Sequence, residues 1–159
     1  MSSFSNEINP IMQIAYDEAL KGMSSNDGGP FGAAIVLNGE VIAAAHNEVL
    51  KTNDPTAHAE VNAIRKASQT LGRFDLSDCI LYTTCYPCPM CMGAIFWARI
   101  PIVYYASSME DAAEGGFDDR RFYTMINNPR TSLDLRPIDT ERTNKLFDFW
   151  RAKSDRHIY

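Results

Sequence analysis

The sequence predicts an α/β fold in which helices cover both faces of a mixed sheet, that is, a three-layer α/β/α sandwich. Apolar residues at three- and four-residue spacing predict amphipathic helices, and short apolar runs bounded by turn residues predict strands. These segments follow one another in the order helix, strand, strand, helix, strand, helix, strand over residues 10–106. Strands separated by helices favour parallel neighbours joined by right-handed crossovers, so we expect one sheet with both parallel and antiparallel pairs.

The first helix and hairpin have clear local signals. Residues 10–23 carry apolar side chains at helical spacing, with Asn9 as the expected N-cap and Pro10 at the first helical position. Turn-forming residues follow at 24–30. The apolar runs 31–37 and 40–46 are separated by Asn-Gly, which predicts a β-hairpin.

The remaining elements follow from the same two patterns. A loop at 52–56 leads into a helix over 57–71 that begins near His58. We further expect a strand at 80–84, a helix opened by the proline-rich residues 86–90, a strand at 101–106, a short helix ended by Gly-Gly at 115–116, a turn at 127–129 and a final helix at 140–153.

Length and composition favour a single domain over residues 1–159. Hydrophobic residues make up 45% of the chain and charged residues 22%, which argues against disorder. A domain of this size buries roughly 68–70% of its unfolded surface. Fifteen Lys and Arg against twenty Asp and Glu give a net charge of −5, the wrong sign for neutralising many phosphates, so a nucleic-acid partner is disfavoured.

The expected location is the cytoplasm. The first ten residues lack the basic and apolar segments of a signal peptide, and no stretch approaches the ~18 apolar residues of a membrane span. The four cysteines, Cys79, Cys85, Cys88 and Cys91, fall within thirteen positions. In a reducing compartment such a cluster indicates metal binding or catalysis rather than disulfides.

Four residues form a zinc motif. His58 and Glu60 open one predicted helix, and Cys88 and Cys91 open the next, which gives the H-x-E…P-C-x-x-C signature of zinc deaminases. Residues i and i+3 share a helix face, so both sulfurs point the same way, and the helix N-terminus favours thiolates.

The two half-motifs can meet only beyond the helix ends. Residues i and i+2 lie ~200° apart about a helix axis, so His58 and Glu60 cannot face one metal beside the helix. If the two helices follow neighbouring parallel strands, their N-termini lie side by side at the strands' carboxyl ends. Three protein ligands then leave a fourth position for water, as in catalytic zinc sites, and Glu60 is free to carry protons.

A second arrangement of the cysteines remains open. Cys85 and Cys88 form an overlapping CxxC, so His58 with Cys85, Cys88 and Cys91 could build a closed Cys₃His site in a structural, non-enzymatic zinc module. Against this, Cys85 ends a predicted strand and would have to turn back across Pro87, and Glu60 would have no task.

The motifs resemble those of the cytidine deaminase-like superfamily of zinc-dependent enzymes, and most closely its guanine deaminase branch. The matching stretches are residues 28–33, 53–60, 87–91, 93–99 and 111–119. The zinc motif specifies only the superfamily, whereas Gly-Phe-Asp-Asp at 116–119 narrows the resemblance to guanine or guanosine deaminases. The resemblance implies a mixed, mostly five-stranded sheet.

The resemblance also implies a reaction. Guanine is hydrolysed to xanthine and ammonia: a hydroxide on one zinc ion per subunit attacks C2, while Glu60 shuttles protons to ring N3 and the leaving amino group. His58, Cys88 and Cys91 would hold the metal.

The same resemblance assigns substrate contacts and a quaternary structure. Asn47 would hydrogen-bond the purine, Asp119 would hold the 2-amino group and share in proton transfer, and Ala59, Phe31, Trp97 and Tyr159 would complete the site. The chain would form a homodimer in which segments 140–159 are exchanged, so that Tyr159 covers the partner's site. On the residues alone, Asn47 is better explained as a strand-end turn residue, Phe31 and Trp97 as core aromatics, and Asp119 as part of a charged run.

One position departs from the family. Tyr86 stands where a glutamate usually precedes the P-C-P-M-C segment, which bears on substrate preference. Guanosine deaminase and tRNA adenosine deaminase are the alternative activities, although the latter would be expected to carry basic residues for phosphates.

Overall fold

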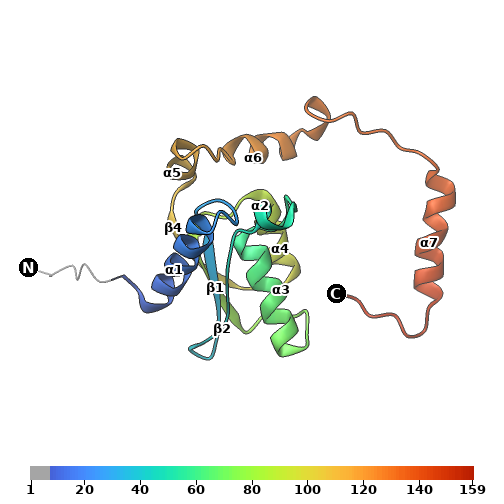
Figure 1. The fold of residues 1–159 in the computed structure, drawn as a ribbon. Helices are drawn as coiled ribbons and strands as arrows, with labels where there is room; N and C mark the ends of the chain where they lie inside the picture. Colours follow the sequence, from blue (N-terminus) through green and yellow to red (C-terminus); the bar gives the residue numbers. More distant parts are fainter. Residues whose placement is uncertain (1–7) are drawn as a thin grey trace, which may run out of the picture. The chain divides into compact units, whose positions relative to one another are not determined.

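Four strands form the sheet in the computed structural model of the protein, which describes residues 8–159. They are β1 (Gly32–Leu37), β2 (Glu40–His46), β3 (Cys79–Cys85) and β4 (Ile102–Ser107), in the order β2-β1-β3-β4 (Figure 1). β1 pairs antiparallel with both β2 and β3, and β3 pairs parallel with β4. The prediction of a mixed sheet is therefore confirmed.

The expectation of a mostly five-stranded sheet is wrong for the described residues. Directly after β4, Ser108 caps helix α5 (Met109–Glu114): its side chain accepts from the backbone N–H of Asp111, whose carboxylate accepts in turn from the backbone of Ser108. This reciprocal capping box starts a helix where a further strand would have to begin. The chain then continues into α6 (Arg120–Asn127), the 3₁₀ helix η1 (Pro129–Thr131) and α7 (Thr140–Ala152).

Helices cover both faces of the sheet, which confirms the three layers. On one face, α1 (Pro10–Ser24) places Met12 and Ala15 against Ala34. On the other face, α3 (Ala59–Leu71) and α4 (Pro89–Trp97) pack against the core to which Ala33 and Ile35 belong (Figure 1). Successive strand residues point to opposite faces, which explains how β1 serves both layers.

The hairpin and the first helix form as their local signals predict. Asn38 and Gly39 both have positive φ values of 51° and 82°, as a type I′ turn requires. Asn9 caps α1 by accepting from the backbone N–H groups of Ile11 and Met12. A short helix, α2 (Val49–Thr52), lies in a segment for which no element was predicted.

We expected the strands that precede the two motif-bearing helices to be neighbours in the sheet. This is wrong, because β1 lies between those strands, β2 and β3. The tight hairpin places β1 beside β2, and the other edge of β1 then pairs with β3. Since β1 is antiparallel to both, β2 and β3 run in the same direction and end at the same edge of the sheet, where Gly32 pairs with His46 and Ala33 with Thr83. The predicted convergence of the helices that follow these strands is therefore retained.

The chain divides into two compact units, Met1–Arg120 and Arg121–Tyr159. The single-domain organisation stays a prediction. In the second unit, α7 confirms the predicted final helix, and Leu146, Phe147 and Phe149 are exposed. Among residues 8–159, no helix has the length and apolar character needed to span a bilayer. The expectation that the first ten residues carry no signal peptide concerns in part residues 1–7, which lie outside the described residues.

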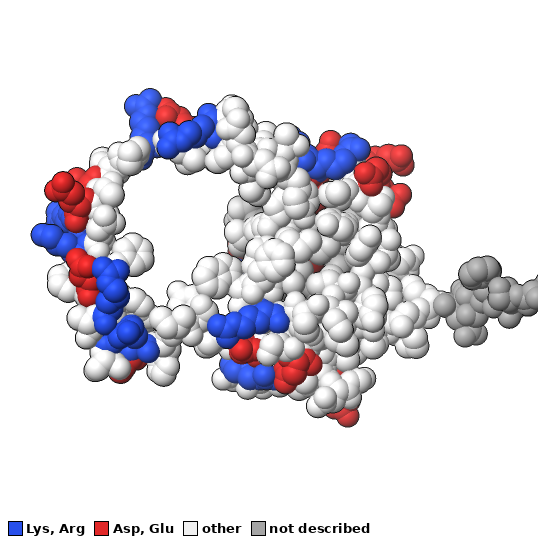
Figure 2. Space-filling model, turned by 180° about the vertical axis from the view of Figure 1, so that it is seen from behind, with Lys and Arg blue, Asp and Glu red and all other residues white. Residues whose placement is uncertain are grey.

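Charged side chains of both signs lie next to one another. Groups of Lys and Arg on the face displayed in Figure 2 have Asp or Glu beside them. The ion pairs Arg73–Asp78 and Arg99–Asp75 of the first unit and Arg136–Asp134 of the second illustrate this pattern. The arginines in these pairs already have carboxylate partners.

Candidate active site

Three side chains from two helix N-termini meet at one point. His58 is the N-cap of α3, Cys88 is the N-cap of α4, and Cys91 lies in the first turn of α4. Nδ1 of His58 lies 3.5 Å from Sγ of Cys88 and 3.5 Å from Sγ of Cys91. The three potential ligand atoms all lie within 4.8 Å of one another.

This geometry fits a zinc ion. Tetrahedral coordination with Zn–S near 2.3 Å and Zn–N near 2.05 Å places nitrogen and sulfur ligands ~3.6 Å apart. The two observed separations agree with that value, and imidazole and thiolate are ligands that zinc prefers. His58, Cys88 and Cys91 therefore form a cluster able to hold one metal ion.

Cys85 is directed elsewhere. Its Sγ lies 3.6 Å from the carbonyl oxygen of Ser108, and it does not belong to the cluster of His58, Cys88 and Cys91. Burial raises the pKa of the Cys85 thiol to about 11, which favours the neutral form. This placement supports the three-ligand arrangement over the closed Cys₃His site.

The ligand side chains differ in their charge. A hydrogen bond from the Cys91 thiol, together with the contact to His58, lowers the pKa of Cys88 to about 4. The same hydrogen bond to Cys88 raises the pKa of Cys91, and contact with the Cys88 thiolate raises the pKa of His58. The lowered pKa makes Cys88 a thiolate at neutral pH, which is the form that binds zinc, and His58 would bind the metal as the neutral imidazole.

Glu60 lies buried beside this cluster. Only 6% of the residue is exposed. Its Oε1 lies 3.0 Å from Oγ1 of Thr83, and its Oε2 lies 3.4 Å from Sγ of Cys91. Burial raises the pKa of the Glu60 carboxyl, and a buried carboxyl with a raised pKa is a candidate general acid or base.

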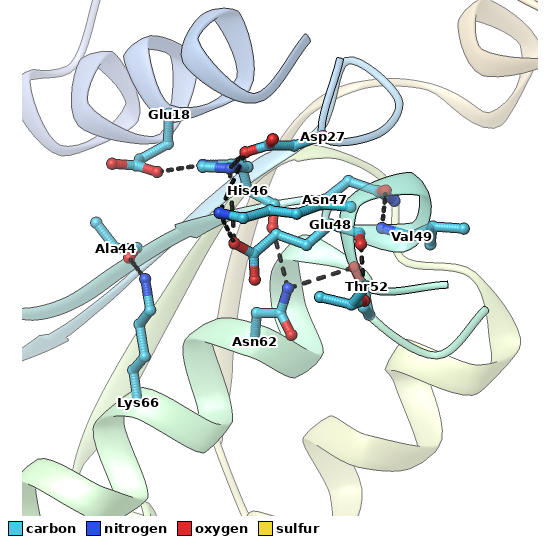
Figure 3. Close-up of polar contacts among 12 residues, drawn as sticks. Glu18, Asp27, Ala44, His46, Asn47, Glu48, Val49, Thr52, Asn62 and Lys66 are labelled. Carbon is cyan, nitrogen blue, oxygen red and sulfur yellow. Dashed lines mark hydrogen bonds and ion pairs between the residues drawn. The ribbon is translucent and has the colours of Figure 1, made fainter. Parts of the chain in front are cut away.

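Asn47 presents its amide in a fixed orientation. Its backbone N–H donates to the carbonyl of Phe31 at 3.0 Å. Its Oδ1 accepts from the backbone N–H of Val49 at 3.1 Å (Figure 3). Since Oδ1 is engaged, Nδ2 is the atom with which the side chain can donate to a ligand. Gly28 makes this possible, because a Cβ atom there would lie 2.0 Å from Oδ1 of Asn47.

These groups face a common cavity of about 440 Å³. Phe31 and Phe117 form one wall, with ring centroids 5.0 Å apart and planes at 85°. Such a volume suits a small planar molecule, and aromatic walls with a few polar groups are typical of ligand sites. The lining consists of Gly28, Gly29, Phe31, Asn47, Val49, Leu50, Pro55, His58, Glu60, Cys85, Tyr86, Cys88, Phe117 and Asp119.

Six of the ten predicted site residues line this cavity, and Cys91 belongs to the metal cluster beside it, but three residues are in neither group. Trp97, at the end of α4, is 66% exposed, and Ala59 is fully buried in the first turn of α3. Tyr159 belongs to the second unit, where it is 66% exposed. The roles of these three residues in substrate binding stay predictions.

Two aromatic residues of the cavity were not predicted as site residues. Phe117 belongs to the Gly-Phe-Asp-Asp segment, so the segment that narrowed the family could also have indicated this residue. Tyr86, at the position where the family resemblance implies a glutamate, contributes to the lining, and its ring contacts that of Tyr105 edge to face at 5.0 Å. The wall at this position is therefore aromatic rather than acidic.

The fold and the cluster define a zinc-binding deaminase. The model of the cytidine and deoxycytidylate deaminase zinc-binding region matches residues 5–107, and the chain belongs to this family. It is 49% identical over 143 residues to guanine deaminase of Bacillus subtilis (strain 168), covering 89% of this chain and 92% of that protein. The X-ray structure of guanine deaminase from Bacillus subtilis matches with a TM-score of 0.90 and 45% identity, covering 96% of this chain and 99% of that one.

Deaminases that act on RNA are also similar. A tRNA-specific adenosine deaminase of Aquifex aeolicus is 40% identical over 144 residues, which cover 88% of this chain and 91% of that protein. Membership of the family is thus compatible with more than one substrate.

Proposed function

We propose that this protein is a guanine deaminase that hydrolyses guanine to xanthine and ammonia. The observation that carries the proposal is the buried Glu60 carboxylate, which lies next to the His58, Cys88 and Cys91 cluster at a purine-sized cavity. The 49% identity to a guanine deaminase supports guanine as the base.

Each polar group has a task in this reaction. When bound, the zinc ion supplies a nucleophile at neutral pH by lowering the pKa of a water molecule to ~7. Glu60 accepts a proton from that water and gives it to ring N3 of guanine. It then moves the proton of the new C2 hydroxyl to the 2-amino group, so that the C2–N bond breaks, ammonia leaves and the C2 carbonyl of xanthine forms. Its burial among Thr83, Cys91 and the cluster keeps bulk water from competing for this proton.

The cavity walls suit a purine. Nδ2 of Asn47 donates to an acceptor on the edge of the base, and the Phe31–Phe117 pair contacts its apolar surface. The Asp119 carboxylate, which lines the same cavity, accepts from the 2-amino group. A donor and an acceptor on the walls match the mixed hydrogen-bonding pattern of guanine.

The test is an ammonia assay on the purified protein with guanine, guanosine, adenine and cytosine. We expect release from guanine at a kcat/KM at least 100-fold above that for the other three. Absence of ammonia from guanine would overturn the proposal, and faster release from guanosine would replace it with guanosine deaminase.

A second candidate is tRNA adenosine deaminase, because of the Aquifex aeolicus relative. Its substrate demands many cationic contacts, so binding should weaken steeply with salt. The net charge of −5 and the pairing of surface arginines with carboxylates favour the free base instead. Conversion of adenosine to inosine in a tRNA, together with salt-sensitive binding, would favour this second candidate.

We further propose one deaminase domain that acts as a homodimer with exchanged segments 140–159. Each unit exposes large apolar side chains that a second copy would cover: Phe96 and Trp97 in the first, and Leu146, Phe147 and Phe149 in the second. Light scattering should give twice the chain mass.

We also place the protein in the cytoplasm. None of the four cysteines forms a disulfide, which favours a reducing compartment.

A mixing experiment tests the exchange. Glu60→Gln lacks the proton shuttle, and Tyr159→Ala lacks the residue expected to cover the partner's site. If the segments are exchanged, mixing the two inactive variants restores up to a quarter of the activity, because one site of the mixed dimer is intact. No recovery on mixing, or an unimpaired Tyr159→Ala variant, would contradict the role of Tyr159.

A further inference from the structure

A buried histidine outside the zinc cluster joins two acidic side chains. Nδ1 of His46 lies 2.7 Å from Oε2 of Glu18, and Nε2 lies 2.8 Å from Oδ2 of Asp27 (Figure 3). The His46 side chain is 9% exposed. Glu18 comes from α1 and Asp27 from the loop that follows it, so the imidazole ties the end of β2 to the helical layer on that face.

The cluster is not built for a metal ion. Asp27, His46 and Glu48 offer closely spaced ligand atoms, but the Lys51 ammonium lies 3.1 Å from Oε1 of Glu48 and 3.6 Å from Oδ2 of Asp27. The Lys51 ammonium therefore supplies the positive charge that a metal ion would otherwise bring to these carboxylates. Both ring nitrogens of His46 already face carboxylates, so the side chain is fully engaged in hydrogen bonding.

The backbone of His46 is held from the opposite layer. Nδ2 of Asn62 in α3 donates to the carbonyl oxygen of His46 at 3.1 Å and to that of Ala57 at 3.3 Å. Ala57 directly precedes His58. The chain on either side of the cavity is thus anchored by one buried amide, and the end of β2 is held from both faces of the sheet.

Asn47 follows immediately on this anchored residue. Its amide is also restricted by Val49 and by the close approach of Gly28, the residue after Asp27. The backbone carbonyl oxygen of Asp27 accepts from the backbone N–H groups of Leu50 and Lys51, which both follow Val49. Asp27 therefore contacts the His46 imidazole through its carboxylate and α2 through its carbonyl, and it directly precedes Gly28, which lies close to the Asn47 amide.

We propose that His46 is a positioning residue for base recognition: held by Glu18 and Asp27, it fixes the direction in which Asn47 presents its amide to the purine. This inference rests on the proposed function and adds a residue that does not touch the substrate. It predicts that loosening His46 weakens binding of guanine while the chemistry at the zinc cluster continues.

The test compares steady-state kinetics on guanine, zinc content and thermal unfolding for the zinc-loaded wild type, four single variants and one double variant. His46→Gln should raise KM about 10-fold, the effect of one ligand hydrogen bond, and change kcat less than threefold with zinc retained. Glu18→Gln, a milder change at a half-buried position, should raise KM about threefold and keeps the test available if His46→Gln does not fold.

A matched control separates positioning from general stability. Lys66→Gln removes another hydrogen bond to β2, from Nζ to the carbonyl of Ala44 at 3.0 Å, without touching His46 or Asn47. It should leave KM unchanged. Asn47→Ala and the double variant with His46→Gln complete a mutant cycle, in which the double variant should be no worse than Asn47→Ala alone, because both changes act through one amide.

The outcomes distinguish this inference from the proposed function. A wild-type protein without guanine turnover overturns both. With an active wild type, an unchanged KM in both the His46 and Glu18 variants overturns the positioning role, as do fully additive effects in the cycle. A raised KM with non-additivity and a neutral Lys66 control supports it.

Discussion

Oγ1 of Thr83, on β3, lies 3.0 Å from Oε1 of Glu60 in the first turn of α3. Thr83 is 1% exposed and Glu60 is 6% exposed, so water does not replace this contact. The same hydroxyl lies 3.2 Å from the carbonyl of Cys85, but its single proton favours the carboxylate. The carboxylate that is proposed to move protons is therefore aimed by the central part of the sheet.

Glu60→Gln should abolish turnover while zinc remains bound. The amide has nearly the same shape but cannot accept the proton of the attacking water, and general acid–base catalysis is worth about 10²- to 10⁴-fold. Ammonia release and zinc content on the same sample check this. Glu40→Gln, at an exposed position on β2, is the matched control and should be fully active. A Glu60→Gln variant with near-normal turnover would show that Glu60 is not the proton shuttle, whereas a wild type that binds zinc but has no turnover would favour a structural zinc module.

Thr83→Val should lower kcat about 10-fold with little change in KM, because the isosteric side chain no longer donates to the Glu60 carboxylate. Thr84→Val is a control on the same strand: its hydroxyl accepts from the backbone N–H of Gly32 instead. That variant should lose some stability and keep its kcat. Equal kcat values for the two variants would show that the Thr83 hydroxyl does not act through Glu60.

Cys85→Ser and Cys91→Ser should differ in zinc content. Cys91 lies in the ligand cluster, whereas Cys85 contacts the carbonyl of Ser108. Elemental analysis after dialysis should therefore find about one zinc per chain in Cys85→Ser and much less in Cys91→Ser. Zinc loss from Cys85→Ser would instead support the closed Cys₃His arrangement.

The sequence predicts those parts of the site that depend on local signals. His58, Glu60 and the CxxC cysteines lie at helix N-termini, and such ends are marked by nearby residues such as Pro89. The Asn38-Gly39 turn likewise determines the hairpin without reference to the rest of the chain.

Other features depend on pairing between distant segments. Nothing within β1 indicates that its second edge joins β3, so the strand order could not be deduced from periodicity. The partners of His46 lie 28 and 19 residues away, and a lone histidine in an apolar strand carries no pattern that names them. Tyr86 and Phe117 reach the cavity only through the packing of separate loops.

Gly28→Ala should raise KM for guanine about 10-fold, since its Cβ would lie 2.0 Å from Oδ1 of Asn47 and must displace the amide. Gly93→Ala is a suitable control, because a Cβ atom there meets nothing within 4 Å and α4 would tolerate alanine. Steady-state kinetics on guanine distinguish the two. An unchanged KM in Gly28→Ala would show that Asn47 does not contribute to binding of the base.

Asp75 should stabilise the fold in a pH-dependent way. Hydrogen bonds from the hydroxyl and backbone N–H of Ser77, and from the Arg99 guanidinium, hold the pKa of its carboxyl well below the usual value of 3.8. A lowered folded-state pKa means that the stabilisation is fully present above pH 3.8 and is lost as the pH falls through the folded value. Asp75→Asn should therefore be less stable than the wild type at pH 7, and the difference should shrink below pH 4. Urea unfolding of both proteins at several pH values measures the difference in their free energies of unfolding. The contributions of other acid-sensitive groups are the same in both proteins and cancel in this difference. Asp134→Asn, which removes an exposed pair with Arg136, should change stability little. A difference between wild type and Asp75→Asn that stays constant from pH 7 to pH 3 would show that the charge of Asp75 is not the source of its contribution.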